Sequence, residues 1–369
     1  MIYLDSAATS LQKPREVAEA VMAAVGRCGG PGRGTHAPAM LAADTLFACR
    51  EEAASLFSVP DPGQVVFTMN ATHALNLAVH SLISPGGRVV TTGWEHNAVT
   101  RPLRRKGARI TAAVGPLFDA DAFLTSFEKA LPGADAAVCT CVSNVFGFRL
   151  PYEEMARLCR RSGVPLILDA AQAAGHLPLD FKELGAAFVA MPGHKGLLGP
   201  QGTGILLCGA KTKPLLFGGT GTQSLRSDMP EELPDRLEAG TPNVCGVAGL
   251  LEGLRFLGRT GIDSIRFREE KLFDMLQIGL SELEHLHVFA AENSAQCGVI
   301  SVIPERMDCE TLAERLNGHA IAVRSGLHCA PMAHETEGTL ETGTVRFSLS
   351  LFNTEDEIRQ TLKVLRKIL

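Results

Sequence analysis

The sequence lacks the apolar and basic segments that mark proteins of membranes and of nucleic acids. No apolar run reaches the roughly 20 residues that span a bilayer, and no basic block stands out in a chain of formal net charge −5. The first residues contain no charged segment followed by an apolar core, so no secretory signal is evident. Internal repeats and low-complexity segments are also absent. We therefore expect a cytoplasmic protein that binds neither membranes nor nucleic acids.

Cysteine is present, but not in the arrangements that build disulfide or zinc scaffolds. The ten cysteines include no CxxC pair, and a chain of 369 residues needs no covalent staples. Cys139 and Cys141 stand close together in the apolar run 136–142. On a strand both would point to one face, which would allow a metal pair, but small buried core residues are much the commoner case. We expect free thiols and no metal site.

Apolar runs alternate with helical patterns from about residue 16 to residue 210. The runs are apolar throughout, as in strands whose sheet is covered by helices on both faces. This pattern predicts an α/β fold with a mostly parallel sheet, and ligands of such sheets bind beyond the carboxyl ends of the strands. The expected strands are Gln64–Thr68, Arg88–Thr92, Ala136–Thr140, Pro165–Leu168, Ala187–Ala190 and Gly204–Leu207.

The character of the sequence changes after Leu207. Residues 218–243 are rich in Gly, Thr, Pro and acidic residues, which predicts an extended functional loop. One long helical stretch is predicted from about residue 247 to residue 283. The remainder predicts an α+β arrangement whose last helix is opened by the capping box Thr354–Glu357. Its expected strands are Gly298–Val302, Ile321–Arg324 and Thr344–Ser348.

Two short stretches carry the most informative chemistry: a strand that ends in Asp169, and a glycine-flanked loop that contains Lys195. A lysine that forms an imine and a carboxylate that keeps a pyridine nitrogen protonated are what pyridoxal phosphate (PLP) requires. Gln172 is placed to reach the phenolic oxygen of the same ring. A surface lysine, and an aspartate that caps a helix or binds a metal, are the plainer alternatives. Together the two stretches predict a PLP enzyme.

A phosphate site is expected where the predicted helix 71–82 begins. A helix N-terminus offers free N–H groups and a positive dipole end, both of which favour an anion. Ala71 and Thr72 would supply backbone N–H groups and Thr72 a hydroxyl, while Asn70 also suits simple helix capping. His194 is a further candidate donor to the phosphate, beside the lysine.

Three more side chains are candidates for this site. His96 follows the apolar run 88–92 and would stack on the pyridine ring, although a lone histidine in a loop is more often just exposed. Cys329 lies in a loop of small residues, unlike a core cysteine, and its thiolate is the candidate nucleophile. Arg346 is a cation inside an apolar strand and suits a substrate carboxylate, with a structural ion pair as the alternative.

With these residues identified, the chain resembles the cysteine desulfurases of the class V aminotransferase family, in particular the group related to selenocysteine lyase. The resemblance covers nearly the whole length, and the combined order and spacing of its motifs are more specific than any single motif. The matching segments are Tyr3–Ala8, Gly32–His36, Glu95–His96, Ser143–Val145, Asp169–Gln172, Gly193–Lys195, Glu238–Asn243, Arg324–Gly326, His328–Cys329 and Arg346.

The resemblance implies PLP fold type I, an α/β fold with a mostly parallel sheet of the seven-stranded type in a large domain and a smaller α+β domain. We assign residues 16–245 to the large domain, and residues 1–15 with 246–369 to the small one. The implied enzyme is a homodimer that converts L-cysteine into L-alanine and holds the sulfur as a persulfide, for an acceptor thiol or scaffold protein. Selenocysteine lyase, cysteine sulfinate desulfinase and other class V enzymes are the alternatives. A sulfur-carrier scaffold without cofactor is a rival from another class.

The resemblance also assigns roles by position. Lys195 would bind PLP covalently and Cys329 would attack the substrate sulfur, with His96 as the third catalytic residue. Asp169 would pair with the pyridine nitrogen. The implied cofactor contacts are Ala71, Thr72, His96, Asn144, Asp169, Gln172, His194 and Lys195, with Thr241 of the partner subunit, and the implied substrate contacts are Asn144, Arg346, His36 and Arg33.

Two positions depart from the family pattern. Pro192 stands where the family usually has a serine before Gly-His-Lys, which removes a hydroxyl and an N–H group from the expected phosphate site. Leu327 stands where a second histidine is common, so the acid that assists sulfur release has no assigned residue.

Overall fold

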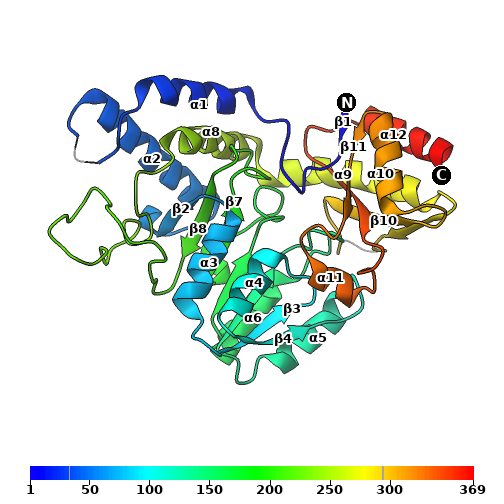
Figure 1. Ribbon diagram of the computed structural model, residues 1–369, viewed down its shortest axis with the longest axis horizontal. Helices are drawn as coiled ribbons and strands as arrows, with labels where there is room; N and C mark the ends of the chain where they lie inside the picture. Colours follow the sequence, from blue (N-terminus) through cyan, green and yellow to red (C-terminus); the bar gives the residue numbers. More distant parts are fainter. Residues whose placement is uncertain (33, 293–294) are drawn as a thin grey trace.

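A seven-stranded sheet forms the centre of the computed structural model, which describes residues 1–32, 34–292 and 295–369 (Figure 1). Its strands are β2 (Val65–Thr68), β3 (Arg88–Thr92), β4 (Arg109–Ala113), β5 (Ala136–Thr140), β6 (Leu166–Asp169), β7 (Phe188–Pro192) and β8 (Gly204–Cys208). Their order in space is β2-β8-β7-β6-β5-β3-β4. Neighbours pair in parallel except at β8, which runs antiparallel to β7 and β2. The predicted mostly parallel sheet is confirmed.

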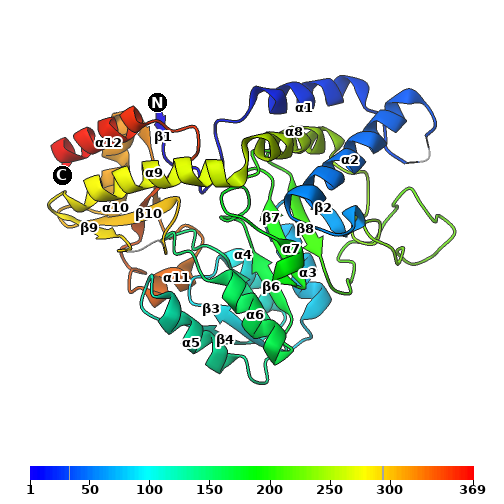
Figure 2. The ribbon, with the colours of Figure 1, turned by 180° about the vertical axis from the view of Figure 1, so that it is seen from behind.

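Helices cover both faces of this sheet. They are α1 (Arg15–Arg27), α2 (Ala37–Leu56), α3 (Ala71–Leu82), α4 (Asn97–Arg105), α5 (Ala120–Ala130), α6 (Tyr152–Ser162), α7 (Phe181–Leu184) and α8 (Val244–Thr260), with a 3₁₀ turn, η1 (Pro62–Gln64). The helices α3 and α4 pack on one face (Figure 1), and α5 and α6 on the other (Figure 2). Successive strand residues therefore enter different cores: Val138 faces α3, and Cys139 faces the opposite layer.

The C-terminal part has its own sheet and core. Its elements are α9 (Ile262–Ser281), β9 (Leu286–Phe289), β10 (Val299–Pro304), α10 (Cys309–Gly318), β11 (Ile321–Ala322), β12 (Arg324–Gly326), α11 (Pro331–Thr336), β13 (Thr344–Ser348) and α12 (Glu355–Ile368). An antiparallel sheet of order β12-β13-β10-β9 packs against α9, α10 and α12. The N-terminal strand β1 (Ile2–Tyr3) pairs in parallel with β11. Figure 2 shows α9 lying across the molecule between this part and the large sheet.

Several local predictions need correction. The single helical stretch expected over 247–283 is two helices, α8 and α9, because Gly261 adopts a positive φ of 81° that ends the first one. The single strand expected over 321–324 is split between two sheets, as β11 and β12. The strands β4 and β9 were not predicted. The capping box at Thr354 and Glu357 is confirmed.

Other expectations concern burial and segment type. Cys139 and Cys141 are fully buried, as expected of core residues, and the described residues contain no cluster of three or more metal-ligating side chains. In the described part of the chain, no helix combines the length and the apolar character needed to cross a bilayer. The division into a domain over 16–245 and a second domain from 1–15 with 246–369 stays a prediction; α8 packs mainly on α1 and α2.

Candidate active site

A cavity of about 220 Å³ opens where the strands β5, β6 and β7 of the large sheet end. This is the carboxyl edge at which ligands of parallel sheets bind. Residues from the C-terminal sheet close its far side. Of the residues singled out in the sequence, the cavity brings together Ala71, Thr72, His96, Asn144, Asp169, Gln172, His194, Lys195, Cys329 and Arg346.

Asp169 and Lys195 both line this cavity, and the charge of each shifts the pKa of the other. Asp169 is the last residue of β6 and is 3% exposed, and its Oδ1 accepts a hydrogen bond from Ala171 N at 2.9 Å. Burial raises the pKa of Asp169, opposed by that hydrogen bond and by Lys195. Burial lowers the pKa of Lys195 to about 8, opposed by Asp169 and assisted by Arg346 and Arg324. In the described part of the chain, no hydrogen bond engages the Lys195 amine.

The loop that carries Lys195 is locked against the turn that follows Asp169. A Cβ added to Gly196 would lie 2.2 Å from Ala174 O, and one added to Gly175 would lie 2.1 Å from Gly196 O. Only glycine permits these backbones to approach so closely. The ring of His176 packs on Gly196, and its Nδ1 pairs with Glu269 of α9 at 2.8 Å. The position of the lysine is therefore fixed by backbone contact on one side and by α9 behind it.

The N-terminus of α3 forms a second wall. Asn70 caps the helix, its Oδ1 accepting from His73 N at 2.9 Å, so the N–H groups of Ala71 and Thr72 remain for a ligand. His194 lies on the same wall, its Nδ1 3.0 Å from Thr9 Oγ1. Burial and the neighbouring Lys195 lower the pKa of His194 to about 4, so it is neutral at pH 7.

His96 is the N-cap of α4. Its Nδ1 accepts a hydrogen bond from Ala98 N at 3.0 Å, which leaves the proton of the neutral ring on Nε2. Burial, followed by the charge of Lys195, lowers the pKa of His96 to about 4. The ring is therefore a neutral, fixed surface within the cavity.

Glu95 supports this wall and had no role assigned from the sequence. It is fully buried, and its Oε1 accepts from Thr92 Oγ1 at 2.7 Å and from Thr140 N at 3.0 Å, which ties the ends of β3 and β5 together. Burial raises its pKa to about 8, opposed by the Thr92 and Thr140 hydrogen bonds. A carboxylate three residues after the end of a buried strand is the sequence signal that indicates such a residue.

Cys329 lies at the outer edge of the cavity and is exposed. It and His328 both have left-handed backbones, with φ of 57° and 48°. Two hydrogen bonds hold this uncommon conformation: Asn97 N donates to Cys329 O at 2.8 Å, and Asn144 Nδ2 donates to His328 O at 2.8 Å. The backbone that displays the thiol is therefore tied to the part of the molecule that contains the large sheet.

Arg346 is buried in β13, and two of its three side-chain nitrogens are engaged. Its Nη2 lies 2.7 Å from Asp5 Oδ1, and its Nη1 donates to Asn144 O at 3.0 Å. Nε is buried without a partner in the described part of the chain. The ion pair that the sequence analysis weighed as the alternative is thus present, and Arg346 also lines the cavity.

Two predicted site residues lie elsewhere, and a third falls outside the described residues. Thr241 lines a separate groove, which it shares with Asn70 and His194. His36 caps α2, its Nδ1 accepting from Ala39 N at 3.4 Å, and is exposed. Arg33 lies outside the described residues.

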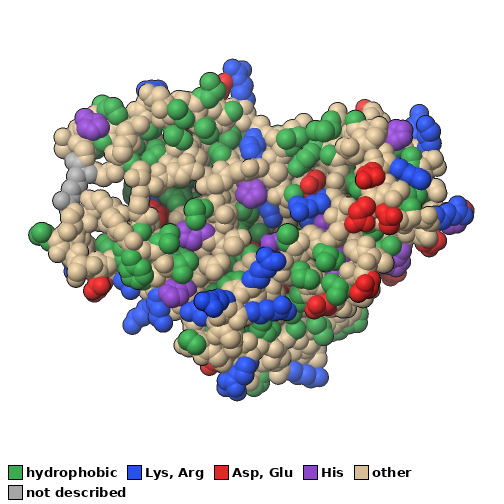
Figure 3. Space-filling model, in the orientation of Figure 1, with side chains coloured by type: hydrophobic (Ala, Val, Ile, Leu, Met, Phe, Trp, Pro, Cys, Tyr) green, Lys and Arg blue, Asp and Glu red, His purple; other side chains and the backbone are tan. Residues whose placement is uncertain are grey.

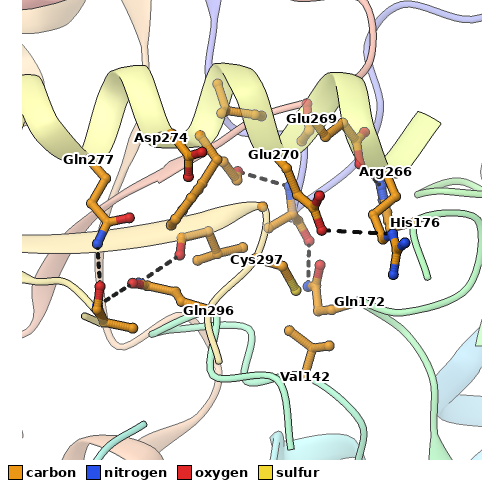
Figure 4. A pocket seen from close by; sticks show the side chains of 18 of the residues that line it. Val142, Gln172, His176, Arg266, Glu269, Glu270, Asp274, Gln277, Gln296 and Cys297 are labelled. Carbon is orange, nitrogen blue, oxygen red and sulfur yellow. Dashed lines mark hydrogen bonds and ion pairs between the residues drawn. The ribbon is translucent and has the colours of Figure 1, made fainter. Parts of the chain in front are cut away.

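A larger cavity of about 770 Å³ lies behind the site, between α9 and the large sheet (Figure 4). It shares Ala7, Val142 and Gln172 with the smaller cavity, so these three residues form a partition. Gln172 is held in this partition because its Nε2 donates to Ala7 O at 3.0 Å. None of the described residues that line the larger cavity is a lysine.

Comparisons with known proteins agree with this geometry. A family model described as aminotransferase class-V matches residues 2–361. A probable cysteine desulfurase of Pyrococcus abyssi is 33% identical over all of this chain and 94% of its own length, and one from Halalkalibacterium halodurans is 33% identical over 100% and 93%. The apo cysteine desulfurase of Thermococcus onnurineus superposes with a TM-score of 0.93 at 32% identity, covering 100% of this chain and 94% of that one. The cysteine desulfurase CsdA of Escherichia coli gives 0.87 at 27%, covering 99% and 94%.

Proposed function

We propose, from the premise that this chain belongs to the class-V aminotransferase family, that it is a PLP-dependent cysteine desulfurase. The reaction would convert L-cysteine into L-alanine and leave the sulfur as a persulfide on Cys329. One observation carries the proposal: a single cavity contains Lys195, with its lowered pKa, Asp169 and an exposed cysteine. An aminotransferase would require the first two residues but not the third.

The residues of the cavity fit PLP. Lys195 offers an amine without a hydrogen-bond partner among the described residues, and Asp169 offers a buried carboxylate for the pyridine N–H. The N–H groups of Ala71 and Thr72, with the Thr72 hydroxyl and His194, would bind the phosphate. His96 would stack on the ring and Gln172 would face the phenolic oxygen. Pro192 lines the same cavity and supplies no N–H group.

PLP, when bound, supplies an electron sink for the bond-breaking at the substrate. The Lys195 amine would remove the proton from the cysteine Cα, for which its pKa of about 8 is well placed. Asn144 and Arg346 would orient the substrate carboxylate. The Cys329 thiolate would attack the substrate sulfur, so that the new S–S bond forms on the enzyme as the Cβ–S bond breaks and Cβ is protonated.

The groove around Thr241 supports a homodimer in which this hydroxyl reaches the phosphate bound by the partner subunit. Exposed apolar side chains, among them Leu216 and Met69, lie at or beside this groove, as expected of a surface that a second copy covers. His36 and Arg33 belong to a segment that we also expect at the substrate side of the assembled dimer.

Mass spectrometry after treatment with cysteine tests the proposal. We expect the Cys329 peptide to gain the mass of one sulfur, with an equal amount of alanine released. A keto acid as the product would instead indicate an aminotransferase, and sulfite from cysteine sulfinate a desulfinase. Selenide release from selenocysteine without a modified Cys329 would indicate a selenocysteine lyase. Any of these outcomes in place of the persulfide would overturn the assignment.

A further inference from the structure

We propose that Cys329 delivers its sulfur to a small thiol that carries negative charge, bound in a basic groove beside the active site. The acceptor would be a low-molecular-weight thiol with one or more carboxylates. This inference rests on the proposed function, because it concerns the second half of that reaction.

The groove is a concavity of about 330 Å³ that adjoins the candidate active site at Cys329, His96 and Thr72. Its volume matches a small organic molecule and not a protein surface. Arg101 and Arg105 form its outer wall. A molecule bound there lies next to the thiol, without entering the cavity assigned to PLP.

The charged side chains that line the groove are positive. Arg101 and Arg105 lie four positions apart on α4, so they project from one face of the helix. Both are exposed, and neither forms an ion pair within the described part of the chain. None of the described residues that line the groove is an aspartate or a glutamate. Lys and Arg side chains gather over the part of the surface where Figure 1 places α4 (Figure 3).

Some exposed arginines on other helices form ion pairs, unlike Arg101 and Arg105. Arg359 on α12 is held by Glu355 at 2.7 Å, and Arg157 on α6 pairs with Glu154. Several exposed arginines on helices of this protein thus take carboxylate partners from their own helix, although Arg27 and Arg104 form no ion pair within the described part of the chain. At the groove the chain supplies none, which leaves two guanidinium groups for the carboxylates of a ligand.

The helix that carries these arginines also positions the thiol. Asn97, the first residue of α4, donates its N–H to Cys329 O at 2.8 Å. The Cys329 backbone is therefore joined directly to the helix that carries the arginine pair. A carboxylate held by Arg101 or Arg105 fixes the approach of its own thiol toward Cys329.

The transfer is balanced without an added oxidant. The acceptor thiolate attacks the outer sulfur of the Cys329 persulfide, and a new S–S bond forms on the acceptor. The S–S bond to Cys329 breaks, its electron pair stays on Cys329 Sγ, and the proton given up by the acceptor thiol restores the Cys329 thiol.

Transfer rates for a charge series of thiols test the proposal. The probes are mercaptosuccinate, 3-mercaptopropionate, 2-mercaptoethanol and cysteamine, added to the holoenzyme that carries the Cys329 persulfide, with rates expressed per thiolate. We expect the dianionic probe to exceed the neutral one on the order of tenfold at low ionic strength, and the advantage to shrink in 0.5 M salt. In the double variant Arg101→Glu/Arg105→Glu the order should reverse in favour of cysteamine.

Arg104→Glu is the matched control, because Arg104 is an exposed arginine of the same helix that does not line the groove. It should retain the charge preference of the parent enzyme. Equal rates for anionic and neutral thiols in the parent enzyme would overturn the proposal. A loss of the charge preference in Arg104→Glu as large as that in the double variant would also overturn it. The first of these results would leave protein acceptors as the remaining class.

A second measurement is independent of turnover. Cys329 is alkylated with iodoacetate and with iodoacetamide, and the ratio of the two rates is compared with that of free N-acetylcysteine. The groove predicts a ratio several-fold above the free thiol, and a ratio at or below it in the double variant. If no persulfide forms from cysteine but this ratio is raised, the proposed function fails while the assignment of the groove as an anion site stands. A ratio that is not raised above that of the free thiol overturns the anion site.

Discussion

The two loops that carry the reactive groups, Lys195 and Cys329, are held in opposite ways. The Lys195 loop is interlocked with the turn after Asp169 through the contact of Gly175 with Gly196, and its amine has a pKa lowered to about 8. Cys329 is exposed, and its left-handed backbone is held by only a few hydrogen bonds. The amine therefore reacts from a fixed position inside the protein, whereas the thiol faces what arrives from outside.

This contrast agrees with a reaction in two halves. Breaking a C–S bond requires a preorganised site, which the Lys195 loop provides. Passing sulfur on requires access to solvent, which the Cys329 loop provides. Substitutions in the first loop should therefore affect cofactor binding and stability, and substitutions in the second should affect only the transfer of sulfur.

The largest effect is expected from Lys195→Ala. Because the imine-forming amine is lost, the bound cofactor should lose its visible absorbance, and turnover should fall on the order of 10⁴-fold. Absorbance spectra and alanine release from cysteine measure both. Lys182→Ala, at an exposed lysine, is the control. Alanine release at the parent rate by Lys195→Ala would contradict the assignment.

Cys329→Ser separates the two halves of the reaction. The cofactor absorbance should be retained, since the thiol lies at the edge of the cavity. The persulfide at position 329 should be lost, because serine has no sulfur to carry it, and alanine release should fall on the order of 10³-fold. Labelling of the persulfide followed by mass spectrometry is the readout. Cys245→Ser, at another partly accessible cysteine, should leave it unchanged. Undiminished sulfur release by Cys329→Ser would show that no enzyme nucleophile is needed.

Gly196→Ala tests the close contact between the Lys195 loop and the turn after Asp169. Its Cβ would meet Ala174 O at 2.2 Å, so we expect a loss of about 1–3 kcal/mol in the free energy of unfolding and weaker cofactor binding. Urea unfolding measures the first effect. The control is Gly26→Ala in α1, where a Cβ meets nothing within 4 Å and should stabilise by about 0.5–1 kcal/mol. Equal stability of the two variants would mean that the close approach is not rigid.

The smallest effect is expected in the pH dependence of the rate of PLP loading. Only the neutral amine attacks the PLP aldehyde, so with a pKa of about 8 the rate of PLP loading into apo-protein should rise about tenfold from pH 7 to pH 9 and then level off. An ordinary lysine would give about a hundredfold rise without levelling. Asp169→Asn removes a carboxylate that raises this pKa, so its midpoint should move below 8. A profile that still climbs at pH 10 would contradict the lowered pKa.

Much of this arrangement was predictable because its causes are local. The buried strands of the large sheet are continuous apolar runs, and the α3 N-terminus is marked by Asn70. The edge strand β4 was not predicted because most of its residues are exposed or half-buried, so its sequence contains no apolar run that indicates a strand. The break between α8 and α9 depends on a single backbone angle at Gly261.

The parts of the site that escaped prediction depend on distant partners. Arg346 pairs with Asp5, far away in the sequence, and the choice between an ion pair and a substrate contact cannot be read from β13 alone. The contact between Gly175 and Gly196 likewise joins two turns whose approach depends on the packing of whole strands. The lack of carboxylates around Arg101 is a property of the surface, not of α4.

The first ten residues connect the C-terminal part and the large-sheet part to the site. Ile2 and Tyr3 pair with β11, Asp5 engages Arg346, and the backbone at Ala7 accepts from Gln172. Ser10 binds the carbonyl of His194 through its N–H and its hydroxyl. Chain ends fray before cores melt. Detachment of this segment would displace several site residues at once and would remove Leu4 from the C-terminal core, so heat and proteolysis near the N-terminus should abolish activity before the large sheet unfolds.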